Sequence, residues 1–308
     1  MDQDVLRSYS EPALEVRPEP FPWLNVVLFI ATGFSTLVVG TFMMVAWDHH
    51  LSAAPGGTFP DVFNHPSELF RGLPFSITIM SILLAHEMGH YLTCRYYGIS
   101  SSLPYFIPFP SFIGTLGAFI QIRSDFKDRS SLLEVGVAGP IAGFVLSVPI
   151  LALAFNYCRF GPTESVDGLI HFGEPLIYKI LAFLMGVTPP PGEDVYLHPV
   201  GFAAWVGLFM TALNLLPIGQ LDGGHIAYAL FGRFHKRISQ LFLLVIFLMG
   251  VFLWPGWLVW ILLLALLGTR HPPTLNDKVP LGKRQVLLGW LGVVMLVLCF
   301  IPAPITIS

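Results

Sequence analysis

Charged side chains are scarce in this chain of 308 residues. Aspartate, glutamate, lysine and arginine together make up 11% of it, whereas about 25% is typical of soluble domains. Hydrophobic residues make up 54%, and the mean hydropathy is +0.70. The basic residues form no dense patch, which excludes a nucleic-acid-binding surface. This composition predicts an all-α polytopic membrane protein that is surrounded by a lipid bilayer.

Cysteine is also scarce, with three residues in separate segments and no Cys-x-x-Cys pair. The pattern favours neither a disulfide framework nor a zinc site built from thiolates. Cys94 lies one helical turn after His90, and we expect it to be a small packing residue rather than a further ligand.

Runs of apolar residues are long and frequent. A helix needs about 20 such residues to cross the bilayer, and on that basis about seven transmembrane helices are predicted. Pro255-Gly256, between Trp254 and Trp257, predicts a tight turn at which the chain re-enters the membrane between the fifth and the sixth predicted helix. The expected ranges are 22–47, 72–97, 132–157, 200–216, 238–253, 256–268 and 285–301.

Lysine and arginine are unevenly distributed between alternate loops. With the N-terminus in the cytoplasm, thirteen of the sixteen lie on the cytoplasmic side, and only Arg71, Arg159 and Lys179 lie outside. The second span then runs inward, which places His86 and His90 in its cytoplasmic half. A bacterial inner membrane is the expected location, and a plastid membrane would also suit the chain.

Two stretches between the spans are not expected to be regular helices. Residues 103–110 are apolar but carry three prolines, and residues 114–123 have the glycines of a strand or hairpin. We therefore predict that 103–123 is a re-entrant, membrane-dipping β-hairpin. The external loop 158–198 is too short for a PDZ domain and includes a predicted interfacial helix at 176–187. The expected divisions are a cytoplasmic tail (1–21), a first transmembrane helix with an external loop (22–71), a core (72–232) and C-terminal transmembrane helices (233–308).

The pentapeptide His86-Glu87-Met88-Gly89-His90 lies inside the apolar range 72–97. Ionisable side chains there cost about 2.5–3.5 kcal/mol each on insertion scales, so they need a compensating role. Residues four apart on a helix lie about 40° apart around its axis, so both imidazoles can bind one zinc ion. Glu87 is then beside the metal, where a general base is needed. The alternative is a pair of buried, hydrogen-bonded histidines that only pack the helix.

A hydrolytic zinc site commonly has three protein ligands and leaves a fourth position to water. Asp222 is the candidate third ligand, because Pro217 and the glycines after it interrupt a helix, and irregular backbone within a membrane usually lines a polar cavity. A turn aspartate is the alternative. Asn214 is predicted either to donate to the oxyanion of a reaction or to hydrogen-bond between helices. His225 is expected to line the site. The remaining histidines are expected to be solvated, and they are His49, His50, His65, His171, His198, His235 and His271.

These residues together resemble the site-2 protease family of intramembrane zinc metalloproteases. The resemblance rests on residues 86–90, on Gly139-Pro140-Ile141-Ala142-Gly143 and on the stretch from Asn214 to His225, and it covers residues 72–232. It implies a three-helix catalytic core. It also implies that His86, His90 and Asp222 bind one Zn2+ per chain and that Glu87 is the catalytic acid and base.

The resemblance further implies the kind of substrate. Substrates would be single-span membrane proteins, commonly regulatory ones, often after another protease has removed their external domain. The strand at 114–123 resembles the membrane-dipping β element of this family, which holds substrate by strand addition; an extended substrate exposes peptide bonds that a helix shields. Two alternatives are an intramembrane zinc or cation transporter and a catalytically inactive membrane scaffold, because intramembrane His and Asp also mark ion pathways.

Overall fold

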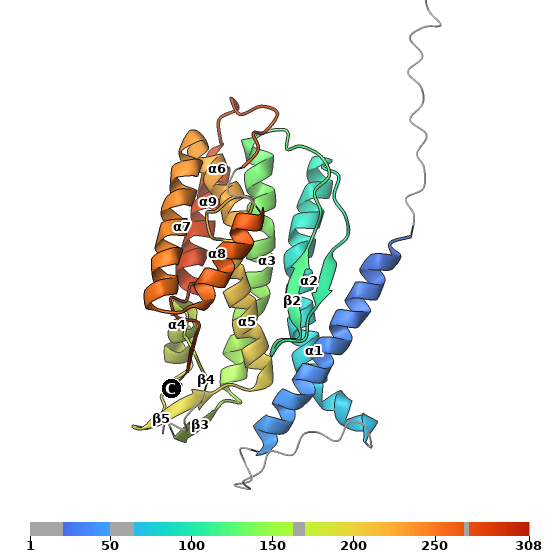
Figure 1. Cartoon of the computed structure of the whole chain (residues 1–308), viewed down its shortest axis with the longest axis vertical. Helices are drawn as coiled ribbons and strands as arrows, with labels where there is room; N and C mark the ends of the chain where they lie inside the picture. The colour runs from blue at the N-terminus through green and yellow to red at the C-terminus, as the bar shows by residue number, and fades with distance from the viewer. Residues whose placement is uncertain (1–20, 50–64, 163–169, 268–270, 308) are drawn as a thin grey trace, which may run out of the picture.

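The computed structural model describes residues 21–49, 65–162, 170–267 and 271–307. Within these ranges the chain is mostly helical, and most of the helices run along the long axis of the molecule (Figure 1). The described 3₁₀ helices are η2 (Pro66–Gly72) and η3 (Gly232–Phe234). The described α-helices are α1 (Trp23–His49), α2 (Leu73–Tyr97), α3 (Arg129–Phe155), α4 (Leu176–Leu184), α5 (Pro199–Asn214), α6 (Asp222–Phe231), α7 (His235–Phe252), α8 (Gly256–Leu267) and α9 (Lys283–Cys299).

The described strands are short and form antiparallel pairs. β1 (Tyr105–Pro108) pairs with β2 (Thr115–Phe119), so the region expected to be a hairpin does contain one. The other pairs are β3 (Arg159–Pro162) with β5 (Glu193–Tyr196), and β4 (Ile170–Phe172) with β6 (Ile305–Ile307). The strands β3, β4 and β5 gather with the C-terminus at one end of the molecule, opposite the loop that precedes α9 (Figure 1).

Four helical stretches of the described chain are long and apolar enough to cross a membrane, which makes this a helical membrane protein. They are Trp23–Asp48, Pro66–Tyr97, Arg129–Phe155 and Asp222–Phe252. Every predicted span overlaps a helix, but α5, α8 and α9 have 16, 12 and 17 residues, fewer than the length of about 20 that a full span needs. The number seven therefore stays a prediction.

The C-terminal helices differ in detail from the expectation. The stretch that ends at Phe252 begins at Asp222 and turns at Gly232, whose φ is +53°. Ser239 of α7 donates to the carbonyl of Pro217, which precedes α6, so α7 runs back beside α6. The predicted break before Gly256 is present, since α7 ends at Phe252 and α8 begins at Gly256.

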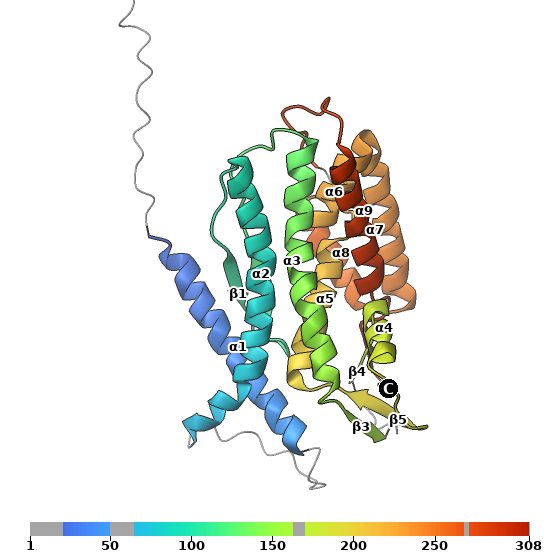
Figure 2. The ribbon, with the colours of Figure 1, turned by 180° about the vertical axis from the view of Figure 1, so that it is seen from behind.

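The helices that surround the buried polar residues are packed closely through glycine. A Cβ at Gly89 of α2 would lie 2.6 Å from the carbonyl oxygen of Ala138 in α3. A Cβ at Gly207 of α5 would lie 2.7 Å from Cγ2 of Ile82 in α2. Small residues let helix backbones approach in this way within a membrane. Figure 2 shows α2, α3 and α5 side by side, and their contact surfaces position the site described next.

The first helix holds the β1–β2 hairpin. Asn25 Nδ2 donates to the carbonyls of Leu103 (2.9 Å) and Pro104 (3.0 Å), just before β1. Ser35 Oγ donates to the carbonyl of Gly114, just before β2, at 2.6 Å. The segments that lead into β1 and into β2 are therefore both held by hydrogen bonds from side chains of α1.

Candidate metal centre

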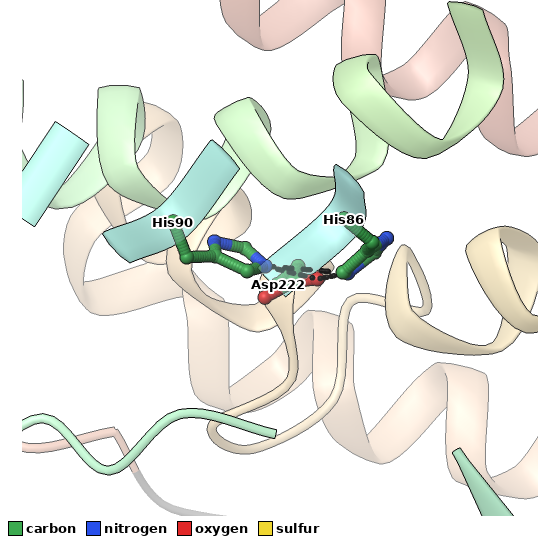
Figure 3. A group of neighbouring side chains, drawn as sticks. All are labelled: His86, His90 and Asp222. Carbon is green, nitrogen blue, oxygen red and sulfur yellow. Dashed lines mark hydrogen bonds and ion pairs between the residues drawn. The ribbon is translucent and has the colours of Figure 1, made fainter. Parts of the chain in front are cut away.

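Three potential metal ligands meet in the interior from two elements that are distant in the sequence (Figure 3). His86 and His90 lie on α2, and Asp222 is the first residue of α6. Asp222 Oδ2 lies 3.2 Å from His86 Nε2 and 3.3 Å from His90 Nε2, and the two Nε2 atoms are 3.2 Å apart. Among the described residues, no other group brings three such atoms within 4.8 Å of one another.

The turn between α5 and α6 delivers Asp222 to the histidines. Gly219 has a φ of +55°, a conformation that glycine adopts without the steric cost other residues incur. A Cβ at Gly223 would lie 1.9 Å from the carbonyl oxygen of Leu215, so only glycine allows the first turn of α6 to pack on the end of α5. A Cβ at Gly224 would likewise lie 2.3 Å from the carbonyl oxygen of Gly219, so both glycines of the Asp-Gly-Gly sequence are needed for this packing, and Asp222 directs its carboxylate at the histidines.

Glycines of α3 form the wall behind the ligands. A Cβ at Gly139 would lie 2.1 Å from His90 Nε2, and a Cβ at Gly143 would lie 3.1 Å from His86 Nδ1. A Cβ at Gly136 would lie 2.8 Å from the Cβ of His225. In the sequence, Gly139 and Gly143 were only part of the resemblance to the site-2 protease family. The structure explains why these positions are glycine, because α3 must leave room for both imidazoles.

Hydrogen bonds orient the imidazoles. His90 Nδ1 lies 2.8 Å from the carbonyl oxygen of Val135, so this nitrogen carries the proton and Nε2 keeps its lone pair for the centre. Asn214 Nδ2 donates to His86 Nε2 at 3.2 Å. Asn214 therefore lies at the site, and its amide reaches the same nitrogen that would bind a metal.

Glu87 lies next to the two histidines and is 5% exposed. The backbone of Ile120, the residue directly after β2, lies close to the carboxylate of Glu87. The end of the hairpin thus touches the residue expected to be the general base. No signal in the sequence indicated this contact, because residues 87 and 120 meet only through the folding of the hairpin against α2.

The donor set fits a zinc ion. Two imidazole nitrogens and one carboxylate oxygen are the ligands of a common class of catalytic zinc site, in which a fourth position is left for water. The space that Gly139 leaves beside His90 Nε2 keeps the ligand atoms free to converge. His86 and His90 are each 6% exposed, so a bound cation would be shielded from bulk water.

Several histidines that were expected to be solvated lie elsewhere in the structure. His235 is 3% exposed and hydrogen-bonds to Ser239, and His271 contacts His225. His198 accepts a hydrogen bond from the N–H of Val200 at the start of α5. The expectation was wrong for His235, because tertiary packing covers this helix end, whereas His171, His198 and His271 are half-buried. His65 is exposed, whereas His50 and the side chain of His49 lie outside the described residues.

Cys94 is fully buried and packs with Ile99 and Val135. This agrees with the small packing role expected for it. A buried thiol among apolar neighbours supplies packing rather than a metal ligand.

Comparison with known proteins places these residues in a family. The model of Peptidase family M50 matches residues 74–254. The chain is 32% identical over 241 residues to "Probable zinc metalloprotease EGY1, chloroplastic" of Arabidopsis thaliana, an alignment that covers 75% of this chain and 43% of that protein. It is 34% identical over 172 residues to "Probable zinc metalloprotease EGY2, chloroplastic" of the same plant, and this alignment covers 56% of this chain and 31% of that protein.

A more extended match is to "Probable zinc metalloprotease EGY3, chloroplastic" of Oryza sativa subsp. japonica, with 27% identity over 317 residues, covering 94% of this chain and 49% of that protein. The chain thus spans about half the length, or less, of these curated relatives. The matched range of the family model contains the ligand candidates, Glu87 and Asn214.

Proposed function

The chain belongs to Peptidase family M50, and we propose that it is an intramembrane zinc endopeptidase, which hydrolyses a peptide bond within or near the transmembrane segment of membrane-anchored proteins. The observation that carries this proposal is the convergence of His86, His90 and Asp222 beside Glu87 in the buried interior. A structural pair of histidines would need no third ligand from another element.

Each residue has a separate task in the proposed reaction. His86, His90 and Asp222 bind the zinc ion, which, when bound, polarises the scissile carbonyl and lowers the pKa of a water molecule to roughly 7. Glu87 accepts the proton of the attacking water and then delivers it to the nitrogen of the leaving amine as the C–N bond breaks. The Asn214 amide donates to the oxygen of the former carbonyl, once the lone pair of His86 Nε2 is taken by the metal.

The β1–β2 hairpin is the proposed place of substrate binding. We propose that it dips into the membrane and that an extended substrate adds to it as a further strand. The contact between Glu87 and the backbone of Ile120 supports this, because a substrate strand laid along β2 would arrive beside the general base. Single-span proteins, including ones already cut by another protease, are the proposed substrates.

The membrane topology is also part of the proposal. Seven spans with a cytoplasmic N-terminus would put the centre toward the cytoplasmic side, in agreement with the distribution of lysine and arginine. The proposed membrane is a bacterial inner membrane or its plastid counterpart, and the names of the EGY relatives call them chloroplastic. The division of the chain into a tail, a first helix with its loop, a core and C-terminal helices, with boundaries at residues 22, 72 and 233, stays a prediction.

The transporter alternative has little support in the described interior. Its buried acidic and basic side chains are His86, Glu87, His90 and His235, and the other buried polar residues carry hydroxyl groups. An ion path across the bilayer needs ionisable groups at several depths. A cleavage assay is the measurement that distinguishes an active protease from an inactive scaffold.

The test of the proposal compares cleavage with zinc content. The purified chain is placed in liposomes with a generic single-span substrate, and zinc is measured by mass spectrometry. Glu87→Gln is expected to abolish cleavage and keep wild-type zinc, whereas Asp222→Asn loses zinc from the centre together with cleavage. Asn214→Ala is expected to keep its zinc and to cleave about 10²–10³ times more slowly, which is the usual effect of removing one hydrogen-bond donor to an oxyanion.

The matched control is Glu174→Gln, the same chemical change at the N-terminal side of α4, which should leave cleavage unchanged. Wild-type cleavage by Glu87→Gln would disprove the assignment of the base. Zinc binding by the wild type without cleavage would disprove the protease. Zinc flux into the liposomes would then identify a transporter, and its absence a scaffold.

A further inference from the structure

Three basic side chains gather where α6 ends and α7 begins. Arg233 lies in η3, and Lys236 and Arg237 lie in the first turn of α7. All three are exposed, and no ion pair between them and a carboxylate is present in the part of the chain that the structure describes. The proposed protease chemistry uses none of these side chains.

Acidic residues are almost absent from this part of the sequence. After Asp222, the only aspartate or glutamate is Asp277. Its carboxylate accepts hydrogen bonds from the hydroxyl groups of Tyr228 at 2.6 Å and Thr274 at 2.7 Å, and it also faces Arg129 of α3. Asp277 is therefore already engaged, and the positive charge at the turn between α6 and α7 is left for a partner from outside the chain.

The ring of Phe234 holds two of the three cations. The guanidinium carbon of Arg233 lies 5.2 Å from the centroid of this ring, and that of Arg237 lies 5.9 Å from it. These cation–π contacts place both guanidinium groups against one aromatic side chain. A guanidinium group pairs with phosphate through two parallel N–H groups, so two of them over one ring suit a phosphate.

The face of α7 that follows the cations is apolar and exposed. Arg237, Leu241, Leu244 and Leu248 are spaced by four, three and four residues, which places them on one side of the helix. The three leucines are 59%, 54% and 45% exposed, so no other described element covers this side. The surface therefore presents positive charge at one end and apolar side chains along the next 16 Å or so, since each helical residue rises about 1.5 Å. The charged end is the end of the molecule that also carries the loop before α9 (Figure 1).

We propose that this surface binds an anionic phospholipid, whose phosphate pairs with Arg233, Lys236 and Arg237 and whose acyl chains lie along the apolar face of α7. The order of charge and apolar surface along the helix matches the order of headgroup and chains in a lipid. Clusters of lysine and arginine beside a membrane-spanning helix are suited to anionic headgroups. A soluble anion or an acidic protein segment would match the cations alone and would leave the leucines uncovered.

The experiment compares two lipids that have the same acyl chains and different headgroups. The full-length protein is freed of lipid in detergent, dioleoylphosphatidylglycerol or dioleoylphosphatidylcholine is added, and native mass spectrometry measures the affinity of each. The wild type is expected to bind phosphatidylglycerol more tightly. The triple variant Arg233→Gln, Lys236→Gln, Arg237→Gln should bind it about 100-fold more weakly, because each cation near an anionic lipid contributes roughly a factor of five. Binding of phosphatidylcholine should stay the same.

The matched control removes the same charge from three separate places. It combines Arg95→Gln, Lys179→Gln and Lys278→Gln, all of them exposed, and it should bind phosphatidylglycerol as the wild type does. A second variant, Arg233→Lys with Arg237→Lys, keeps the charge of the cluster and should retain most of the binding. Unchanged gel-filtration profiles of all variants guard against misfolding.

Three results would overturn the lipid site. They are equal affinity of the wild type for the two lipids, undiminished binding of phosphatidylglycerol by the triple variant of the cluster, and equal loss of binding in the matched control. Displacement of bound phosphatidylglycerol by an excess of inorganic phosphate would also overturn it, because the cations would then bind a soluble anion. The assay needs neither zinc nor a substrate, so its outcome is independent of the proposed protease activity.

Discussion

The absence of a side chain at Gly139 allows His90 to approach Asp222. The residue lies on α3, which binds nothing itself, yet its missing Cβ provides the space that His90 Nε2 occupies. The same logic applies to Gly223, where the carbonyl of Leu215 occupies the space of a side chain. At the scale of single residues, the glycines shape the centre as much as the ligands do.

Replacing Gly139 by alanine should therefore disrupt the centre. The new Cβ would lie 2.1 Å from His90 Nε2, so the imidazole must move away from Asp222. We expect loss of zinc and of cleavage, with an overpacking cost of about 1–3 kcal/mol in stability. Zinc content and thermal unfolding in detergent measure both effects.

The control is Gly33→Ala on α1, where no neighbouring atom lies within 4 Å of the added Cβ. That variant should retain zinc and gain up to about 1 kcal/mol from the better helix propensity of alanine. A Gly139→Ala protein with full zinc and full cleavage would contradict the packing argument.

At the scale of elements, α1 and the β1–β2 hairpin act together. The hairpin is a two-stranded sheet, which is marginal on its own. Hydrogen bonds from Asn25 and Ser35 fix the segments that lead into its two strands, and the rings of Phe29 and Phe106 contact each other with centroids 5.0 Å apart. The first helix, to which the sequence assigned no role, thus supports the element proposed to hold the substrate.

The double variant Asn25→Ala, Ser35→Ala should loosen the hairpin without touching the metal. Each lost hydrogen bond costs about 0.5–1.5 kcal/mol, and the carbonyls of Leu103 and Gly114 lose a donor. We expect slower cleavage, unchanged zinc and faster hydrogen exchange at residues 105–119. Thr78→Ala, which removes a bond to Pro74 within the exposed surface of α2, is the matched control. Equal exchange in both variants would show that α1 does not hold the hairpin.

At the scale of the whole molecule, the two ends are built from different elements. The strands β3, β4 and β5 lie at one end, and the loop before α9 lies at the other (Figure 1). The predicted topology assigns the first end to the outside and the second to the cytoplasm. Cys158 lies between α3 and β3 at the first end, and Lys278 is exposed in the loop at the second.

Labelling with a membrane-impermeant maleimide should therefore reach the two positions from opposite sides. Cys158 is partly exposed, whereas Cys94 and Cys299 are fully buried. Burial raises the pKa of the Cys158 thiol, so the reactive thiolate forms at higher pH and labelling should accelerate as the pH rises through that value. Lys278→Cys in a Cys158→Ser background should label from the other face. Labelling of both positions from the same face would disprove the topology.

The sequence by itself determined the class of protein, the positions of most of the long helices and the identity of the ligand candidates, although it did not predict a helix at Asp222–Phe231. Apolar length and the spacing of His86 and His90 are local properties, and local properties can be read from one stretch of chain. The sequence also suggested Asp222, through the interruption of the helix before it. The range of the hairpin was predicted because proline and glycine act on their own backbone.

Only the tertiary structure decided which distant residues meet. The approach of Asp222 to α2, the contact of Glu87 with Ile120 and the pairing of His225 with His271 join segments that are far apart in the chain. Exposure follows from the same packing, so a histidine at a helix end, such as His235, could not be assigned to the interior from its neighbours in sequence. Side-chain contacts depend on how helices pack, and packing depends on the shape of both surfaces rather than on the periodicity of either one.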